Sequence, residues 1–183
     1  LGSTRSPLTV QELVEALHDP RFAVRFEAVV AIARHGADPQ LIDALVGVLE
    51  GNEPSLSTMA AWALGRLEDE RALEALRRGL GSRYRSVQAH CIRSLGSLGD
   101  RTMVPVMLDW LPVEGDVGLQ MALASALGRL GASEAVEPLL GLLRDSTTHD
   151  ARMEFALALA RLAGEEHRFV QLLRRAESGP GTT

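Results

Sequence analysis

Apolar residues near the start of the chain recur with helical spacing. The segment TVQELVEALHD, which starts at Thr9, places four apolar residues at i, i+3, i+4 and i+7: Val10, Leu13, Val14 and Leu17. Thr9, followed three residues later by Glu12, is typical of a capping box at a helix start, and Pro20 ends this first helix. The segment FAVRFEAVVAIARHG, residues 22–36, predicts a second helix that ends at its glycine. The chain therefore begins with a pair of helices.

The same pattern returns every 31 or 32 residues. Three series of apolar positions keep this spacing independently over five copies: Ile32, Leu64, Leu95, Leu127 and Leu159; Leu17, Leu49, Leu80, Leu111 and Leu143; and Leu13, Leu45, Leu76, Met107 and Leu139. Small residues such as Ala63, Gly65 and Gly128 flank the first series. Glycine inside a helix costs about 1 kcal/mol relative to alanine, so these positions indicate helices whose backbones approach closely. The chain is predicted to be an array of helix-pair repeats.

We expect one repeat domain over residues 8–176. Its repeats are expected at about 9–36, 38–68, 69–99, 100–131 and 132–164, followed by a helix over 165–177 that caps the last repeat. Residues 1–7 and 178–183 are expected to be disordered tails. The start LGSTRS, without Met, indicates a vector remnant or the cut edge of a piece of a larger protein.

Two segments carry a resemblance to a known family. DPRFAVRFEAVVAIARHGAD and ALGRLGASEAVEPLLGLLRD resemble HEAT repeats, specifically the short HEAT-like repeats of the phycobilisome lyase family, over about residues 8–176. The arginine of that family's Val-Arg step is kept only as Arg25 and Arg152, whereas the other copies have Ser57, Gln88 and Gln120. The resemblance implies an all-α, right-handed α-solenoid of five helix pairs plus a C-terminal capping helix. It also implies that the second helices line a concave face.

Composition agrees with such an array. Hydrophobic residues make up 46% of the chain and aromatic residues only 4%, which favours closely packed helices of Ala, Leu and Val. The net charge of −5 gives no bulk attraction to nucleic acid or to an anionic membrane. The chain holds no run of 18 apolar residues, so no membrane span is predicted. All 19 basic residues are Arg, which we attribute to a GC-rich genome and a bacterial source.

The residues of catalysis and metal binding form no recognisable constellation. Cys91 is the single cysteine, which excludes an internal disulfide and a cysteine-based zinc site. Its place in a core column indicates a buried structural thiol, and a reducing, cytoplasmic setting is expected. No two of the five histidines are spaced i, i+4, and the nucleophile-elbow, P-loop and dinucleotide fingerprints are missing. We predict no catalytic residue, metal, cofactor or enzymatic activity in this chain.

The predicted concave face combines apolar side chains with a row of Arg. The positions that point outward from the second helix of each repeat can be aligned from one repeat to the next. The candidate binding residues at these positions are Phe26, Val30, Met59, Trp62, Arg66, His90, Arg93, Met121, Arg129 and Met153. Trp and Met are typical anchors of partner-binding surfaces, and a helix or an extended peptide fits such a groove. The alternative is that neighbouring repeats curve tightly and bury these side chains against one another. Trp62 is the residue that best separates the two interpretations.

Arginine is concentrated in the third repeat. Residues 71–101 hold seven Arg and only two acidic residues, Glu74 and Asp100. Because these Arg belong to both helices and to the turn, we interpret most of them as a solvated surface. The turn SRYRS, with Arg83, Tyr84 and Arg85, is a candidate contact for an anion: an acidic partner, a phosphate or a lipid headgroup.

The leading functional prediction is a non-catalytic module that binds a protein or peptide segment, in cis or in trans. We expect it to be a soluble regulatory part of a larger protein, such as a bacterial membrane transporter. One alternative is a bilin lyase-like chaperone or enzyme that holds a tetrapyrrole in the groove. The other is nucleic-acid binding through the third repeat, which the net charge disfavours.

Overall fold

The computed structural model describes residues 8–177, and side chains up to residue 171. Every regular element in this range is helical, as predicted. The chain divides into two compact units, Leu1–Leu98 and Gly99–Thr183. The tails predicted over 1–7 and 178–183 lie outside the described residues.

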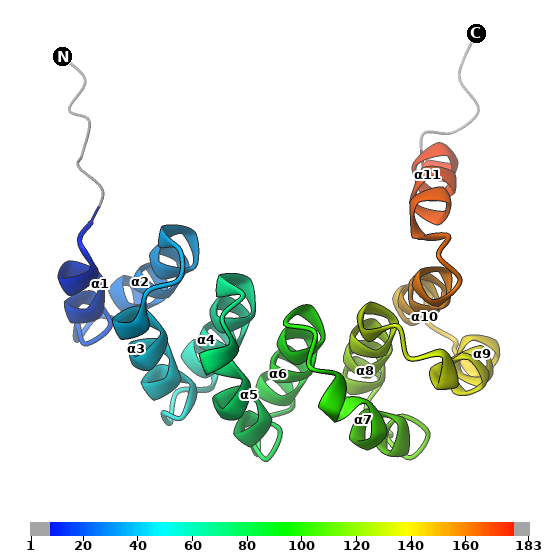
Figure 1. Ribbon diagram of the computed structural model, residues 1–183, viewed down its shortest axis with the longest axis horizontal. Helices are drawn as coiled ribbons and strands as arrows, with labels where there is room; N and C mark the ends of the chain where they lie inside the picture. The colour runs from blue at the N-terminus through cyan, green and yellow to red at the C-terminus, as the bar shows by residue number, and fades with distance from the viewer. Residues whose placement is uncertain (1–7, 178–183) are drawn as a thin grey trace, which may run out of the picture. The chain divides into compact units, whose positions relative to one another are not determined.

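The described part of the first unit consists of helix pairs. These are α1 (Val10–Ala16) with α2 (Phe22–His35), α3 (Pro39–Leu49) with α4 (Pro54–Leu67), and α5 (Leu73–Gly79) with α6 (Arg85–Ser97). The short 3-10 helix η1 (Glu70–Ala72) leads into α5. Helix α4 packs against both α2 and α6, so the second helix of each pair lies beside the next one (Figure 1).

The second unit repeats this plan. The 3-10 helix η2 (Arg101–Met103) leads into α7 (Val104–Trp110), which pairs with α8 (Val117–Leu130). The 3-10 helix η3 (Ser133–Ala135) leads into α9 (Val136–Asp145), which pairs with α10 (His149–Leu162). Helix α8 packs against α10, and the last helix, α11 (Glu166–Glu177), packs on α10 (Figure 1).

The three apolar series supply much of the core of both units, although Leu80 and Leu143 of the series that begins with Leu17 are half-buried. The first-helix series, which is Leu13, Leu45, Leu76, Met107 and Leu139, is at most 1% exposed throughout. In the second-helix series Ile32, Leu64, Leu95 and Leu127 are fully buried, whereas Leu159 is half-buried. Burying each of these side chains contributes about 1.5–3 kcal/mol, so the period seen in the sequence is the period of the core.

Small residues let the second helices approach, as predicted. A methyl group added at Gly65 of α4 would lie 3.0 Å from the Cα of Ser94 on α6 and would overlap the Ser94 side chain. The buried Ser94 hydroxyl donates a hydrogen bond to the carbonyl of Ala61, 2.8 Å away. In the second unit, a methyl group at Gly128 would lie 3.0 Å from the Cα of Ala158. These glycines are tolerated inside helices because the neighbouring backbone occupies the space of a side chain.

The positions that depart from the Val-Arg step of the resembled family nevertheless share one task. In the first four pairs a polar side chain of the second helix donates to a carbonyl at the end of its partner helix or in the turn between them. Arg25 reaches the carbonyl of Asp19 at 2.8 Å, Ser57 that of Val48 at 3.1 Å, Gln88 that of Leu80 at 3.0 Å, and Gln120 that of Glu114 at 2.7 Å. Each bond adds a side-chain donor to a backbone acceptor at the end of a helix or in a turn.

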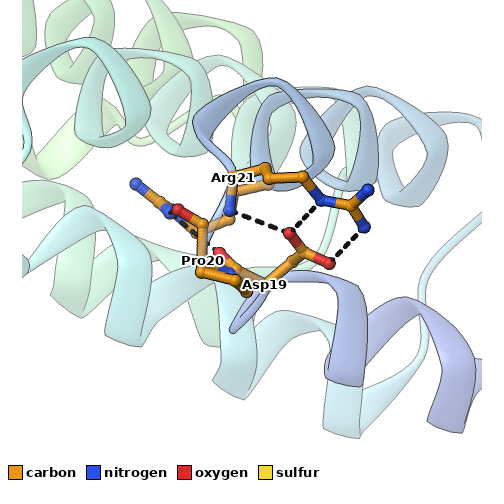
Figure 2. Close-up of polar contacts among 4 residues, drawn as sticks. Asp19, Pro20 and Arg21 are labelled. Carbon is orange, nitrogen blue, oxygen red and sulfur yellow. Dashed lines mark hydrogen bonds and ion pairs between the residues drawn. The ribbon is translucent and has the colours of Figure 1, made fainter.

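Aspartates order the turns. Around Pro20, the Asp19 carboxylate accepts hydrogen bonds from the backbone and the guanidinium of Arg21 (Figure 2). Between repeats, Asp38, Asp69 and Asp100 accept the backbone N–H two residues later, at 2.8, 2.9 and 3.3 Å respectively. These capping aspartates recur every 31 residues, and each one lies where the first helix of the next pair begins.

Candidate functional site

The predicted groove residues of the first unit lie on three helices that are packed side by side. Phe26 and Val30 are on α2, Met59, Trp62 and Arg66 on α4, and His90 and Arg93 on α6. We call these seven residues the second-helix face. Met121 and Arg129 on α8 and Met153 on α10 belong to the second unit, where α8 and α10 pack together.

Register explains why the second-helix face is continuous from α4 to α6. Ser94 lies against Ala61 and Gly65, which aligns the two helices at these positions. Trp62 and Arg93 are the sequence neighbours of this contact, so helix geometry predicts that they lie on the same side of the helix pair. At the beginning of the pair, the Thr58 hydroxyl donates to that of Ser86 at 3.1 Å.

The apolar members of this face are partly open to solvent. Phe26, Val30, Met59 and Trp62 are all half-buried, as are Met121 and Met153 in the second unit. Half-burial leaves part of each side chain open to contact with another molecule. It differs from both sequence-based alternatives, since the side chains are neither fully exposed nor buried.

Cationic groups accompany the apolar ones. The Arg66 guanidinium lies 5.5 Å from the centroid of the Trp62 ring, a cation–π contact between residues one helical turn apart. Arg66 is exposed and Arg93 half-buried, and among the described residues neither forms an ion pair with a carboxylate. The His90 ring donates through Nδ1 to the carbonyl of Ser86, 2.9 Å away. The face can therefore bind an apolar group and an anion together.

A second feature, missed in the sequence, is a cavity of about 510 Å³ at the turns between paired helices. Its walls come from the α3–α4 turn, with Glu50 and Asn52, and from the α5–α6 turn, with Arg83 and Tyr84. We call it the turn cavity. Two of the three residues predicted to contact an anion, Arg83 and Tyr84, line it. The third, Arg85, donates to the side chain of Gln88 at 3.3 Å.

Cys91 is a structural residue, as predicted from its column. It is 0% exposed, its Sγ lies against Gly79, and desolvation by burial raises the pKa of its thiol to about 12. The thiolate is the reactive form, so the native thiol is inert near neutral pH. Across residues 8–177, no three His, Cys, Asp or Glu side chains meet in a way that could bind a metal ion. None of the described helices is long and apolar enough to cross a membrane.

Comparison with known proteins identifies the repeat type. The sequence profile of the family described as HEAT repeats matches residues 10–87 and 79–160. The chain is 32% identical over 109 residues to the bilin biosynthesis protein PecE of Mastigocladus laminosus, across 56% of this chain and 40% of that protein. It is 26% identical over 147 residues to a HEAT repeat-containing taxis protein of Halobacterium salinarum, across 76% of this chain and 36% of that protein. The matches thus span about two fifths or less of these relatives' lengths.

A solved structure shares the fold. The complex of CpcE and CpcF of phycocyanin lyase from Nostoc sp. PCC7120 aligns with a TM-score of 0.75 and 23% sequence identity, over 99% of this chain and 74% of that chain. The predicted all-α solenoid of helix pairs with a C-terminal helix, and the resemblance to HEAT-like repeats of the phycobilisome lyase type, are confirmed.

The leading functional prediction is wrong. The chain was expected to be a non-catalytic interaction module of a larger protein such as a membrane transporter, whereas its 32% identical relative is a bilin biosynthesis protein, which favours the bilin lyase-like alternative. The reason is physical: helical periodicity reports how repeats stack on one another, and stacking is the same whatever the exposed face binds.

Proposed function

We propose, from the premise that the chain belongs to the HEAT repeat family, that it is a bilin lyase-like protein whose second-helix face holds an open-chain tetrapyrrole. The observation that carries the proposal is the half-buried Trp62 with the Arg66 guanidinium over its ring, in a chain related to a bilin biosynthesis protein.

The chemistry of a bilin matches this face. A bilin is a long, flat, conjugated molecule with two propionate side chains, so it needs apolar contact along its length and cations near its middle. The Trp62 ring offers a stacking surface, and Phe26, Val30 and Met59 extend the apolar contact toward α2. Arg66 and Arg93 are placed to receive propionates, because the described residues supply neither with a carboxylate.

Binding in this proposal is non-covalent. Cys91 is the chain's single thiol, and its burial and raised pKa keep it from attacking a bilin. The role of these residues is to bind and orient the pigment and to exclude water from one side of it, and we assign no catalytic residue. Within the second unit, Met121, Arg129 and Met153 repeat the combination of Met and Arg on α8 and α10.

We also infer that the chain works with a protein partner. Its structural neighbour is a complex of two proteins, and a bilin carrier must pass its pigment to an acceptor. A surface that leaves one side of the bilin open is suited to such a transfer.

The test is a titration of the purified chain with biliverdin and, separately, with phycocyanobilin, followed by visible absorbance and induced circular dichroism. We expect saturable binding of at least one bilin. Trp62→Ala removes the stacking surface and Arg66→Gln removes a charge-assisted hydrogen bond, and each should weaken binding about tenfold. The matched control is Arg71→Gln, because Arg71 is an exposed arginine already paired with Asp69 in a turn.

Far-ultraviolet circular dichroism establishes that each variant keeps its helices. The proposal fails if neither bilin binds the parent chain. It also fails if Arg66→Gln, which alters an exposed side chain and leaves the core untouched, binds as tightly as Arg71→Gln.

A further inference from the structure

The turn cavity has a chemistry of its own. Its most buried lining residues are Leu49, Ser57, Ala75 and Val87, each at most 5% exposed, and we call the three apolar ones its floor. Its rim is polar and carries two guanidinium groups, those of Arg78 and Arg83. A volume of about 510 Å³ exceeds that of a few water molecules and is in the range of small-molecule sites.

The two arginines differ in the groups that they already bind within the protein. Arg78 donates to the Glu50 carboxylate through Nε at 3.0 Å, and this ion pair raises the pKa of Arg78. Its charge is therefore balanced at the cavity wall. Arg83 donates to the Tyr84 hydroxyl, and its guanidinium lies 4.7 Å from the centroid of the Tyr84 ring. Among the described residues no carboxylate forms an ion pair with Arg83, so the cavity keeps one uncompensated positive charge.

The equivalent place one repeat earlier lacks this chemistry. A cavity of about 460 Å³ lies there, between α1–α2 and α3–α4, and Arg25 in its wall pairs with Glu53. The Arg83–Tyr84 dipeptide corresponds to Asn52–Glu53 in the second repeat. In the fourth and fifth repeats the corresponding dipeptides are Gly115–Asp116 and Thr147–Thr148. The turn between paired helices thus recurs, while the pair of a cationic and an aromatic residue, Arg83 and Tyr84, belongs to the third repeat.

We propose that the turn cavity binds a small planar organic anion, specifically an aromatic monocarboxylate. The ring lies on the floor of Leu49, Ala75 and Val87, next to the Tyr84 ring, and the carboxylate pairs with Arg83. Stacking on Tyr84 already holds the guanidinium in place, so little side-chain entropy is lost when the anion arrives. This site shares no residue with the second-helix face and does not depend on the bilin proposal.

The experiment is a titration of the ¹⁵N-labelled chain with 2-naphthoate, followed by amide chemical shifts. We expect saturable shifts that centre on Gly51, Asn52 and residues 81–87, with a dissociation constant of about 1 mM or lower. 2-Naphthylmethanol, which has the same ring and no charge, should bind about tenfold more weakly, since hydrogen bonds to charged groups are the stronger ones. Arg83→Gln should weaken naphthoate binding by a similar factor, whereas the control Arg71→Gln should not.

Three results would overturn the site: no shifts at these amides up to about 10 mM naphthoate, equal binding of the alcohol, or unchanged binding by Arg83→Gln. Tyr84→Leu adds a second test, because losing the ring should weaken both naphthoate and the alcohol. The bilin titration separates the two proposals. Arg83→Gln should leave bilin binding unchanged, and Trp62→Ala should leave naphthoate binding unchanged.

Discussion

Replacing Gly65 by alanine tests whether the close approach of α4 and α6 holds the first unit together. The added methyl group would lie 3.0 Å from the Cα of Ser94 and overlap that residue's side chain, so the helices must separate or the serine must turn. Overpacking of this kind costs about 1–3 kcal/mol. Loss of the buried hydrogen bond from Ser94 to Ala61 costs about 1–3 kcal/mol more.

Helix propensity acts in the opposite direction. Alanine is favoured over glycine inside a helix by about 1 kcal/mol. The net expectation is a loss of about 1–5 kcal/mol in the free energy of unfolding, and its midpoint of about 3 kcal/mol lowers the Tm of a chain of this size by roughly 6–12 °C. Gly47→Ala is the matched control, because Gly47 is an exposed position within α3 and a methyl group there meets no atom within 4 Å. That variant should raise the Tm by about 2–4 °C.

Thermal unfolding of both variants, followed by circular dichroism at 222 nm, gives the comparison. We predict that the two substitutions shift the Tm in opposite directions, since helix propensity alone would make both variants more stable. If Gly65→Ala raises the Tm as much as Gly47→Ala does, the helices are not in contact at Ser94 and the argument from small residues is refuted.

Three further predictions concern single side chains. Glu68 ends α4 with a φ of +53°, and the equivalent residue at the end of α8 is Gly131, with a φ of +63°. Glu68→Gly should therefore relieve about 1 kcal/mol of left-handed strain and raise the Tm by a few degrees. A lower Tm would contradict this. Arg71 lowers the pKa of Asp69 to about 2 from an ordinary 3.8, so its stabilisation is present above about pH 4 and is lost as the pH falls through 2. Asp69→Asn should therefore show a shallower fall in Tm over this interval than the parent, and equal slopes would exclude the pairing. The Cys91 thiol should not react with 5,5′-dithiobis(2-nitrobenzoic acid) at about pH 8 until the chain is unfolded in guanidinium, and rapid reaction of the native chain would show that it is accessible.

The fold could be predicted because repetition and burial leave the same trace in the sequence. Leu13, Leu45 and Leu76 recur at a fixed spacing because each fills the same place in successive helix pairs. The small residue at Gly65 is visible for the same reason, since its neighbour on α6 is fixed by the period. The division into five repeats with the stated boundaries stays a prediction.

The turns were harder to read. Ser57, Gln88 and Gln120 looked like departures from a family pattern, yet each donates to a carbonyl beside its own turn, as Arg25 does. Different side chains can supply one donor, so residue identity alone concealed the shared role. The turn cavity was missed because its walls come from two turns 30 residues apart, whose separation in space depends on how the helix pairs stack.

The ligand could not be read from the pattern either. A half-buried Trp beside Arg suits a peptide as well as a pigment, because both offer apolar area together with carboxylates. The second-helix face remains a proposal for that reason, and similarity to a bilin biosynthesis protein rather than periodicity directed it toward bilins.

The central claim is that a tetrapyrrole lies on α4 and α6 beside Trp62. Determining the structure of the chain with phycocyanobilin or biliverdin bound tests it most directly. The account predicts density for the bilin against the Trp62 ring, with a propionate within hydrogen-bonding distance of Arg66 or Arg93. Density at the turn cavity instead, or a bilin that makes no contact with α4, would contradict it.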